Sequence, residues 1–284
     1  MKKIILTVVA AVMAISSVWG QKYPDGFLTD ETRPKNYDFV KPYPELTSGA
    51  FAYDFYYYQW GREQRDYQDV SQQALWDESA GLYQVFGVDS ILGIDLSRDT
   101  TPEIILLCER AATDASTANT AVKNKYQRLR PFFTFKEESL KPWTDEEEGK
   151  TLSYPSGHSS RGYIFALALC TVAPDHTTEI MLRAQDYALN RVICGHHWKT
   201  DTDASLLLAA TMFANVVCTE GYQAQLKKAI AEYKSIIGGG TRIDAPAAEA
   251  ASRSAAIYDM NGRQLNAKPD NGIYIQDGQK YIAR

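Results

Sequence analysis

Histidine and cysteine are scarce in this chain, which has only four of each in 284 residues. None of the cysteines stands at metal-ligand spacing, and so few histidines supply a zinc site poorly. The net charge of −5 gives no basic excess to attract nucleic acid or anionic lipid. Past residue 20 no apolar run reaches the ~20 residues that a spanning helix needs. The sequence therefore indicates a protein with no membrane span, no nucleic-acid partner, no metal and no cofactor.

The first 20 residues have the layout of a secretory signal peptide. Lys2 and Lys3 precede an apolar segment over 4–15, and small residues follow up to Gly20. The apolar segment is too short to span a bilayer, and no cysteine follows it to carry a lipid. We therefore expect an exported protein that begins at Gln21, located in the periplasm or beyond it.

Export makes disulfide bonds possible among the four cysteines. Four cysteines allow three complete pairings. Each one lies in an apolar, helix-like stretch, so buried free thiols fit as well as bridges do. The pairing of Cys108, Cys170, Cys194 and Cys218 is left open.

Helical periodicity dominates the middle of the chain, where apolar residues recur at three- and four-residue intervals without strand-like alternation. The tail alternates apolar and polar residues around Asn-Gly and Asp-Gly turns, which predicts a short β-hairpin. A tail of this size buries too little surface to fold stably alone. We predict a signal peptide over 1–20, an extended segment over 21–46, an all-α domain over 47–237, a linker over 238–255 and a tail over 256–284.

The first block of chemical interest is basic and closes a predicted helix that runs from Pro102 towards Arg130. Lys123 and Arg130 are seven residues apart, so a continuous helix places them on one face, as a clamp for an anion. Lys125 and Arg128 stand between them. Taken alone, the block fits a solvated basic face better than a binding site.

The second block is Pro155-Ser156-Gly157-His158. Ser156 and Gly157 precede an apolar run and are predicted to form a helix N-terminus, where free N–H groups favour an anion. Gly157 allows close approach, and His158 would lie beside the anion as a titratable group. A simple turn with a surface histidine is the alternative.

The third block places Arg191, His197 and Asp201 around a predicted helix break at Gly195. A carboxylate one turn from an imidazole can accept from one ring nitrogen and leave the other as a nucleophile. Adjacent His196 and His197 could suggest a metal, but neighbouring side chains usually diverge.

Together the blocks read Lys-x6-Arg-Pro, Pro-Ser-Gly-His and Arg-x5-His-x3-Asp, and in this order they resemble the signature of the PAP2 phosphatase superfamily. That superfamily also includes vanadium haloperoxidases. Asn190 departs from the pattern because the family usually has serine there. The residues Arg-Val-Ile-Cys-Gly-x-His-Trp and the helical body are similar to soluble bacterial class A non-specific acid phosphatases over residues 44–234. The resemblance implies a compact all-α, bundle-type core like that of PAP2 phosphatases and haloperoxidases.

The resemblance also implies a role for each residue. His197 would attack phosphorus, Asp201 would orient it, and His158 would protonate the leaving group and then activate water. The phosphoryl oxygens would be held, without metal, by Lys123, Arg130, Ser156, Gly157 and Arg191. The implied activity is hydrolysis of phosphate monoesters through a phosphohistidine, with inorganic phosphate as product.

Other functions remain open at this point. A vanadate-dependent haloperoxidase would use the same cage, and a non-catalytic phosphate-binding protein would need only its cations. The segment 257–284 resembles C-terminal sorting regions of Bacteroidetes proteins that the type IX secretion machinery recognises, which would put the protein on the cell surface or in the medium. The sequence leaves the natural substrate, the pH optimum and the oligomeric state open, a homodimer included.

Overall fold

The computed structural model describes residues 24–88 and 91–238, and in the tail 257–258, 264–265, 267–268, 272–276 and 279–283. The predicted signal peptide and most of the predicted linker lie outside these residues. The chain divides into two compact units, 1–241 and 242–284. Each unit is described by itself.

The described part of the first unit has helices and no strands, which confirms the predicted all-α core. The helices are α2 (Phe51–Gln64), α3 (Gln68–Ser79), α4 (Leu82–Gly87), α5 (Pro102–Tyr126), α6 (Pro131–Phe135), η2 (Pro142–Thr144), α7 (Asp145–Glu148), α8 (Gly157–Val172), η3 (Pro174–His176), α9 (Thr177–Ile193), α10 (Lys199–Val216) and α11 (Glu220–Gly238).

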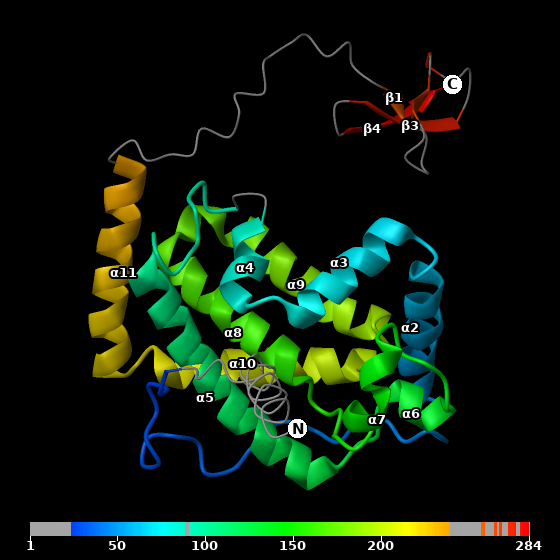
Figure 1. The fold of residues 1–284 in the computed structure, drawn as a ribbon, viewed down its shortest axis with the longest axis horizontal. Helices are drawn as coiled ribbons and strands as arrows, with labels where there is room; N and C mark the ends of the chain where they lie inside the picture. The colour runs from blue at the N-terminus through cyan, green and yellow to red at the C-terminus, as the bar shows by residue number, and fades with distance from the viewer. Residues whose placement is uncertain are drawn as a thin grey trace, which may run out of the picture. The chain divides into compact units, whose positions relative to one another are not determined.

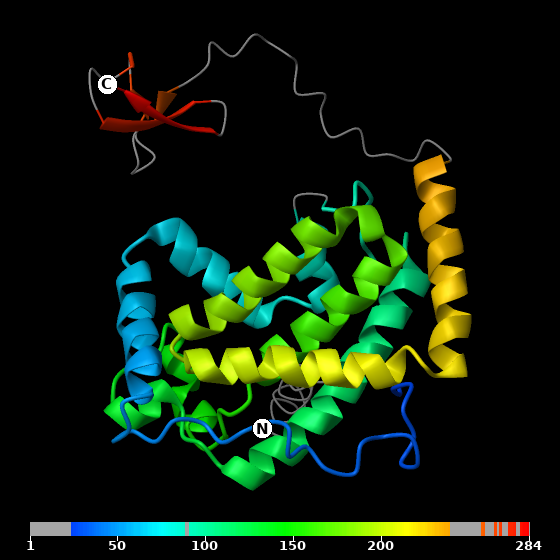
Figure 2. The same cartoon turned by 180° about the vertical axis from the view of Figure 1, so that it is seen from behind.

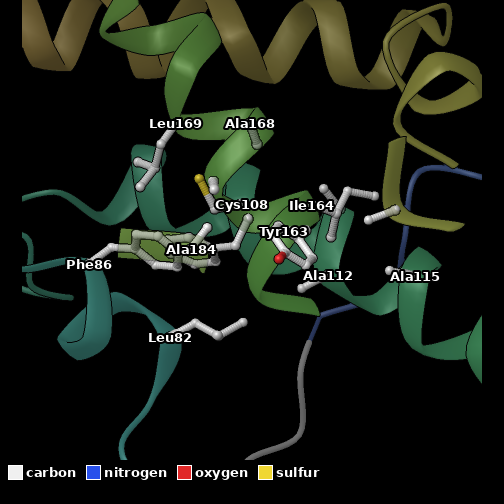
Figure 3. Close-up of a cluster of buried hydrophobic side chains, with 14 of the residues drawn as sticks. Leu82, Phe86, Cys108, Ala112, Ala115, Tyr163, Ile164, Ala168, Leu169 and Ala184 are labelled. Carbon is white, nitrogen blue, oxygen red and sulfur yellow. The ribbon is translucent and has the colours of Figure 1, made fainter. Parts of the chain in front are cut away.

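Helix α8 lies at the centre of the unit, where it contacts α5, α9 and α10 (Figure 1, Figure 2). Its neighbour α5 presents small side chains such as Ala111, Ala112 and Ala115, all fully buried, so the two backbones can approach closely. Phe86 of α4 stacks on Phe165 of α8, with ring centroids 5.2 Å apart. Figure 3 shows this core, in which Leu82 and Phe86 meet side chains of α5, α8 and α9. The N-termini of α8 and α10, where predicted site residues stand, are thereby held by a tightly packed core.

Residues 24–50 contain no helix and cross the body as an irregular segment. The buried Asp114 of α5 accepts the N–H of Phe27 at 2.7 Å and that of Leu28 at 3.2 Å. Further along, the Tyr126 hydroxyl donates to the Val40 carbonyl at 2.6 Å. The segment therefore runs along α5 from the middle of the helix to the end that carries the basic block.

All four cysteines are free in the structure. Cys108 and Cys194 are buried, and burial raises the pKa of both thiols. They pack as small apolar side chains.

No described helix is by itself long and apolar enough to cross a membrane; α10 and α11 meet the length and composition criteria only as a pair, and that pair is bent by 95°.

The described tail residues form four short strands: β1 (Ile257–Tyr258), β2 (Gln264–Leu265), β3 (Gly272–Gln276) and β4 (Gln279–Ala283). They pair antiparallel in the order β2-β1-β3-β4. The role of the C-terminal tail in sorting stays a prediction.

Candidate active site

The third block folds around a break between α9 and α10. Gly195 takes a φ of 79°, in the left-handed region that glycine tolerates, and ends the α9 segment just before His197. Asp201 lies in the first turn of α10, where one of its oxygens, Oδ2, accepts the Trp198 N–H at 2.9 Å. The same Oδ2 lies 3.3 Å from His197 Nδ1. One carboxylate oxygen thus caps the helix and holds the imidazole.

The partners of His197 fix its protonation. Asp201 as a carboxylate can only accept, so the proton sits on Nδ1. On the other side Nε2 lies 3.3 Å from Nη1 of Arg130, which can only donate. Burial and the nearby charges of Arg130, Lys123 and Arg191 lower the pKa of His197 well below its usual range. The buried imidazole is therefore neutral, with a lone pair on Nε2.

Arg130 is almost fully buried, and groups from neighbouring segments of the chain hold its guanidinium. Nη1 donates to the His196 carbonyl at 2.9 Å, and Nη2 donates to Thr151 Oγ1 at 2.7 Å. An ion pair to Glu148 at 2.9 Å completes the contacts of Nη2.

Lys123 lies in the last turn of α5, and its Nζ donates to the Leu152 carbonyl. Burial, followed by the charge of Arg130, lowers the Lys123 pKa to about 7. The charges of Lys123 and Arg130 therefore act on each other.

The route that brings Lys123 and Arg130 together differs from the prediction. Helix α5 ends at Tyr126 because Gln127 takes a left-handed φ of 50°, and its N–H bonds the Lys123 carbonyl. Arg130 stands in an extended conformation beyond that cap. The predicted continuous helix to Arg130, with both residues on one helix face, is therefore wrong.

Alternation along residues 128–130 replaces that helical face. Arg128 and Arg130 are 4% and 7% exposed, whereas Leu129 between them is 49% exposed. The sequence suggested that Arg128 belongs to a solvated basic face, but Arg128 is buried. It donates to Asp201 Oδ1 at 2.7 Å and to Asp54 Oδ2 at 2.6 Å.

Asp54 is a site residue that the sequence analysis missed. It is fully buried in α2, and it accepts the Thr200 N–H at 2.8 Å and the Thr200 hydroxyl at 2.7 Å. Arg128 therefore joins Asp54 to Asp201 behind His197. No local signal marks Asp54, because it lies 146 residues from Thr200.

The second block forms the start of α8. Ser156 is the N-cap, its Oγ accepts the Ser159 N–H at 3.3 Å, and Gly157 is the first helical residue. His158 follows, and burial, then Arg161, His196, Arg130 and Lys123, lower its pKa well below the usual range. The cations of the first block, Lys123 and Arg130, thus act on His158 as well as on His197.

Arg191, at the end of α9, is buried and paired with Glu78 of α3. Its Nη2 lies 3.0 Å from His196 Nδ1, and its Nε has no hydrogen-bond partner among the described residues. Burial lowers its pKa, although the guanidinium stays charged. Glu78 was also missed, since only the packing of α3 on α9 brings it near.

Asn190, the departure from the family pattern, supports the same end of α9. Its Nδ2 donates to Asp77 Oδ2 at 2.7 Å, and Arg183 donates to that oxygen at 3.0 Å. Asp77 is the fully buried neighbour of Glu78. Consecutive carboxylates of α3 therefore hold Asn190 and Arg191.

His196 links Arg191 to the segment 137–151. Because Arg191 can only donate, Nδ1 of His196 accepts and its Nε2 carries the proton towards Ser139 Oγ at 3.2 Å. Burial lowers the His196 pKa to about 2, so the ring is neutral. No group of three His, Cys, Asp or Glu residues in the described part of the chain could hold a metal ion.

The geometry thus joins an imidazole lone pair, a second histidine, a helix N-terminus and three cations. Such a site can bind a phosphoryl group and present a nitrogen nucleophile to it.

The model of the PAP2 superfamily matches residues 104–224, a span that contains all three blocks. A non-specific acid phosphatase of Providencia stuartii is 29% identical over 248 residues, which cover 83% of this chain and 99% of that protein. A non-specific acid phosphatase of Salmonella typhimurium is 32% identical over 139 residues, covering 49% of this chain and 56% of that protein. An acid phosphatase of Zymomonas mobilis is 33% identical over 118 residues, covering 42% and 45%. The signature blocks, the all-α core and these comparisons agree: residues 104–224 match the PAP2 superfamily, and the chain is similar to bacterial non-specific acid phosphatases.

Proposed function

We propose that this protein is an exported acid phosphatase that hydrolyses phosphate monoesters through a phosphohistidine on His197, without a metal ion. The observation that carries the proposal is the setting of His197. Asp201 lies 3.3 Å from Nδ1, and Nε2 is left unprotonated beside the cations. A neutral, oriented imidazole is a nitrogen nucleophile ready for in-line attack.

Binding of the phosphoryl group is assigned to the cations and to the start of α8. Arg191 offers an Nε without a partner among the described residues, and Lys123 and Arg130 contribute charge from the first block. The Ser156 hydroxyl and the Gly157 N–H add neutral donors at the helix N-terminus. These charges stabilise the equatorial oxygens of the transition state, the task that metal ions perform in other phosphatases.

The reaction then has two displacements. His197 Nε2 forms a bond to phosphorus as the ester P–O bond breaks, and His158 gives its proton to the leaving oxygen. The phosphoryl dianion raises the low pKa of His158 by offsetting the cations around it, so the ring can carry that proton. Next His158 takes a proton from water, water oxygen attacks phosphorus, and the P–N bond breaks to release phosphate and His197.

Export and final location rest on the sequence. The signal peptide supports export to the periplasm, and the tail supports delivery to the surface or medium by type IX machinery. Finding the intact tail on periplasmic protein would count against the second step.

Release of phosphate from p-nitrophenyl phosphate in the presence of EDTA tests the proposed function. Metal-independent turnover is the expected result. Halide oxidation that depends on added vanadate, without ester hydrolysis, would indicate a haloperoxidase. Phosphate binding without either reaction would indicate a binding protein.

A further inference from the structure

The guanidinium of Arg130 is surrounded by partners within the chain. Its five N–H groups have Thr151 Oγ1 and the carbonyls of Glu148 and His196 as uncharged oxygen acceptors, at 2.7–3.1 Å. His197 Nε2 lies 3.3 Å from Nη1, and the Glu148 carboxylate forms an ion pair with Nη2 at 2.9 Å. A phosphoryl oxygen that binds Arg130 must therefore compete with these partners, and at Nη2 with the Glu148 carboxylate.

Most of these acceptors are fixed in place. The two carbonyls belong to the backbone, and the Thr151 hydroxyl is tied by its own donation to the Glu148 carbonyl at 2.7 Å. His197 Nε2 is the atom that receives phosphorus in the proposed reaction. Glu148 differs because its carboxylate is the one charged partner among them, held by an ion pair, and its side chain is 24% exposed.

The charge of Glu148 also reaches the rest of the site. It is among the charges that raise the pKa of Lys123, against the stronger effect of burial. In this position the Glu148 carboxylate offsets part of the positive charge of Arg130 and Lys123, as a bound phosphoryl group would. A phosphoryl group can make more charge-assisted hydrogen bonds to the same cations, so the exchange can proceed in its favour.

We infer that the Glu148 carboxylate is an internal competitor for the phosphoryl group, which substrate and product phosphate must displace from Arg130. Glu148 thereby sets the affinity of the site for phosphate. The inference rests on the proposed function, since it takes the phosphoryl group to bind at Arg130. The other role that the contact allows is that Glu148 orients Arg130, and it predicts the opposite effect on affinity.

Calorimetric titration of the mature protein with inorganic phosphate separates the two roles. We expect Glu148→Gln to lower the dissociation constant about 3- to 10-fold, since a competing charge at a partly exposed ion pair is removed. The titration is made at about pH 5, below the Lys123 pKa of about 7, so that the ammonium stays charged in every variant.

Glu147→Gln is the matched control. Glu147 is the preceding residue, its side chain is 81% exposed, and it pairs with Lys150. The control removes the same unit of charge from the same segment without touching Arg130, and it should leave the dissociation constant within about twofold.

An unchanged or higher dissociation constant in Glu148→Gln would overturn the inference, as would an equal gain in Glu147→Gln. Glu148→Ala gives a second reading, because it removes the acceptor together with the charge and must also tighten binding. If the unaltered protein hydrolyses p-nitrophenyl phosphate and binds phosphate, the proposed function stands whatever the variants do. If it does neither, the proposed function fails and the inference fails with it.

Discussion

Arg128 offers the sharpest test of how the nucleophile is held. Its guanidinium is the shared partner of two fully buried carboxylates, Asp54 and Asp201. It also lies over the Trp198 ring, 4.9 Å from the centroid. The substitution Arg128→Gln removes the cation and leaves both carboxylates in a poorly solvated place.

The cost to stability follows from that burial. Removing one partner of a buried ion pair costs about 3–5 kcal/mol of unfolding free energy. For a domain of this size the loss corresponds to a fall in Tm on the order of 10 °C. Thermal unfolding followed by circular dichroism measures it.

The cost to activity should fall on kcat. Arg128 touches Asp201 and not the phosphoryl group, so we expect kcat to drop about 10- to 100-fold while KM stays within about twofold. Burial raises the Asp201 pKa and Arg128 opposes that rise. Loss of Arg128 raises this pKa further, so Asp201 is protonated at higher pH and the acidic limb of the kcat profile moves upward.

Lys125→Gln is the matched control, because Lys125 is exposed and pairs with the exposed Asp38. It should leave Tm, kcat and KM unchanged. An Arg128→Gln variant with kcat within twofold of the unaltered protein would refute this reasoning. A rise in KM alone would mean that Arg128 contacts the substrate.

Two further predictions concern the other ionisable groups. Because the Lys123 ammonium loses its proton as pH rises through about 7, kcat/KM should fall through the same range, and Lys123→Arg should move that limb upward; an unmoved limb would assign it to another group. His158→Ala should slow esters with poor leaving groups far more than activated aryl phosphates, and equal losses on both would argue against its role as general acid.

Local signals in the sequence predicted three helix boundaries, although not the end of α5 at Tyr126. Pro102 begins α5, Ser156 caps α8 and Gly195 ends the α9 segment, as their backbone preferences require. These preferences act within a few residues and need no knowledge of the fold. The order of the three blocks then indicated which side chains share a site.

The buried residues that support the site, such as Arg128 and Asp54, showed no such signal in the sequence. Arg128 looked like Lys125 in the sequence, yet one is buried between carboxylates and the other is exposed. The difference arises because Gln127 ends the helix, and the cost of burying Asp54 and Asp201 is then offset by turning Arg128 inward. That energy depends on residues 73 and 74 positions away, which no local pattern reports.

The central claim is that His197 carries the phosphoryl group. The direct measurement is rapid quenching at alkaline pH during turnover of p-nitrophenyl phosphate, followed by peptide mass spectrometry. The account predicts one phosphoryl group per chain, on His197, and none in His197→Ala, which also loses the burst of p-nitrophenol. A burst that persists in His197→Ala, or a phosphoryl group on another residue, would contradict it.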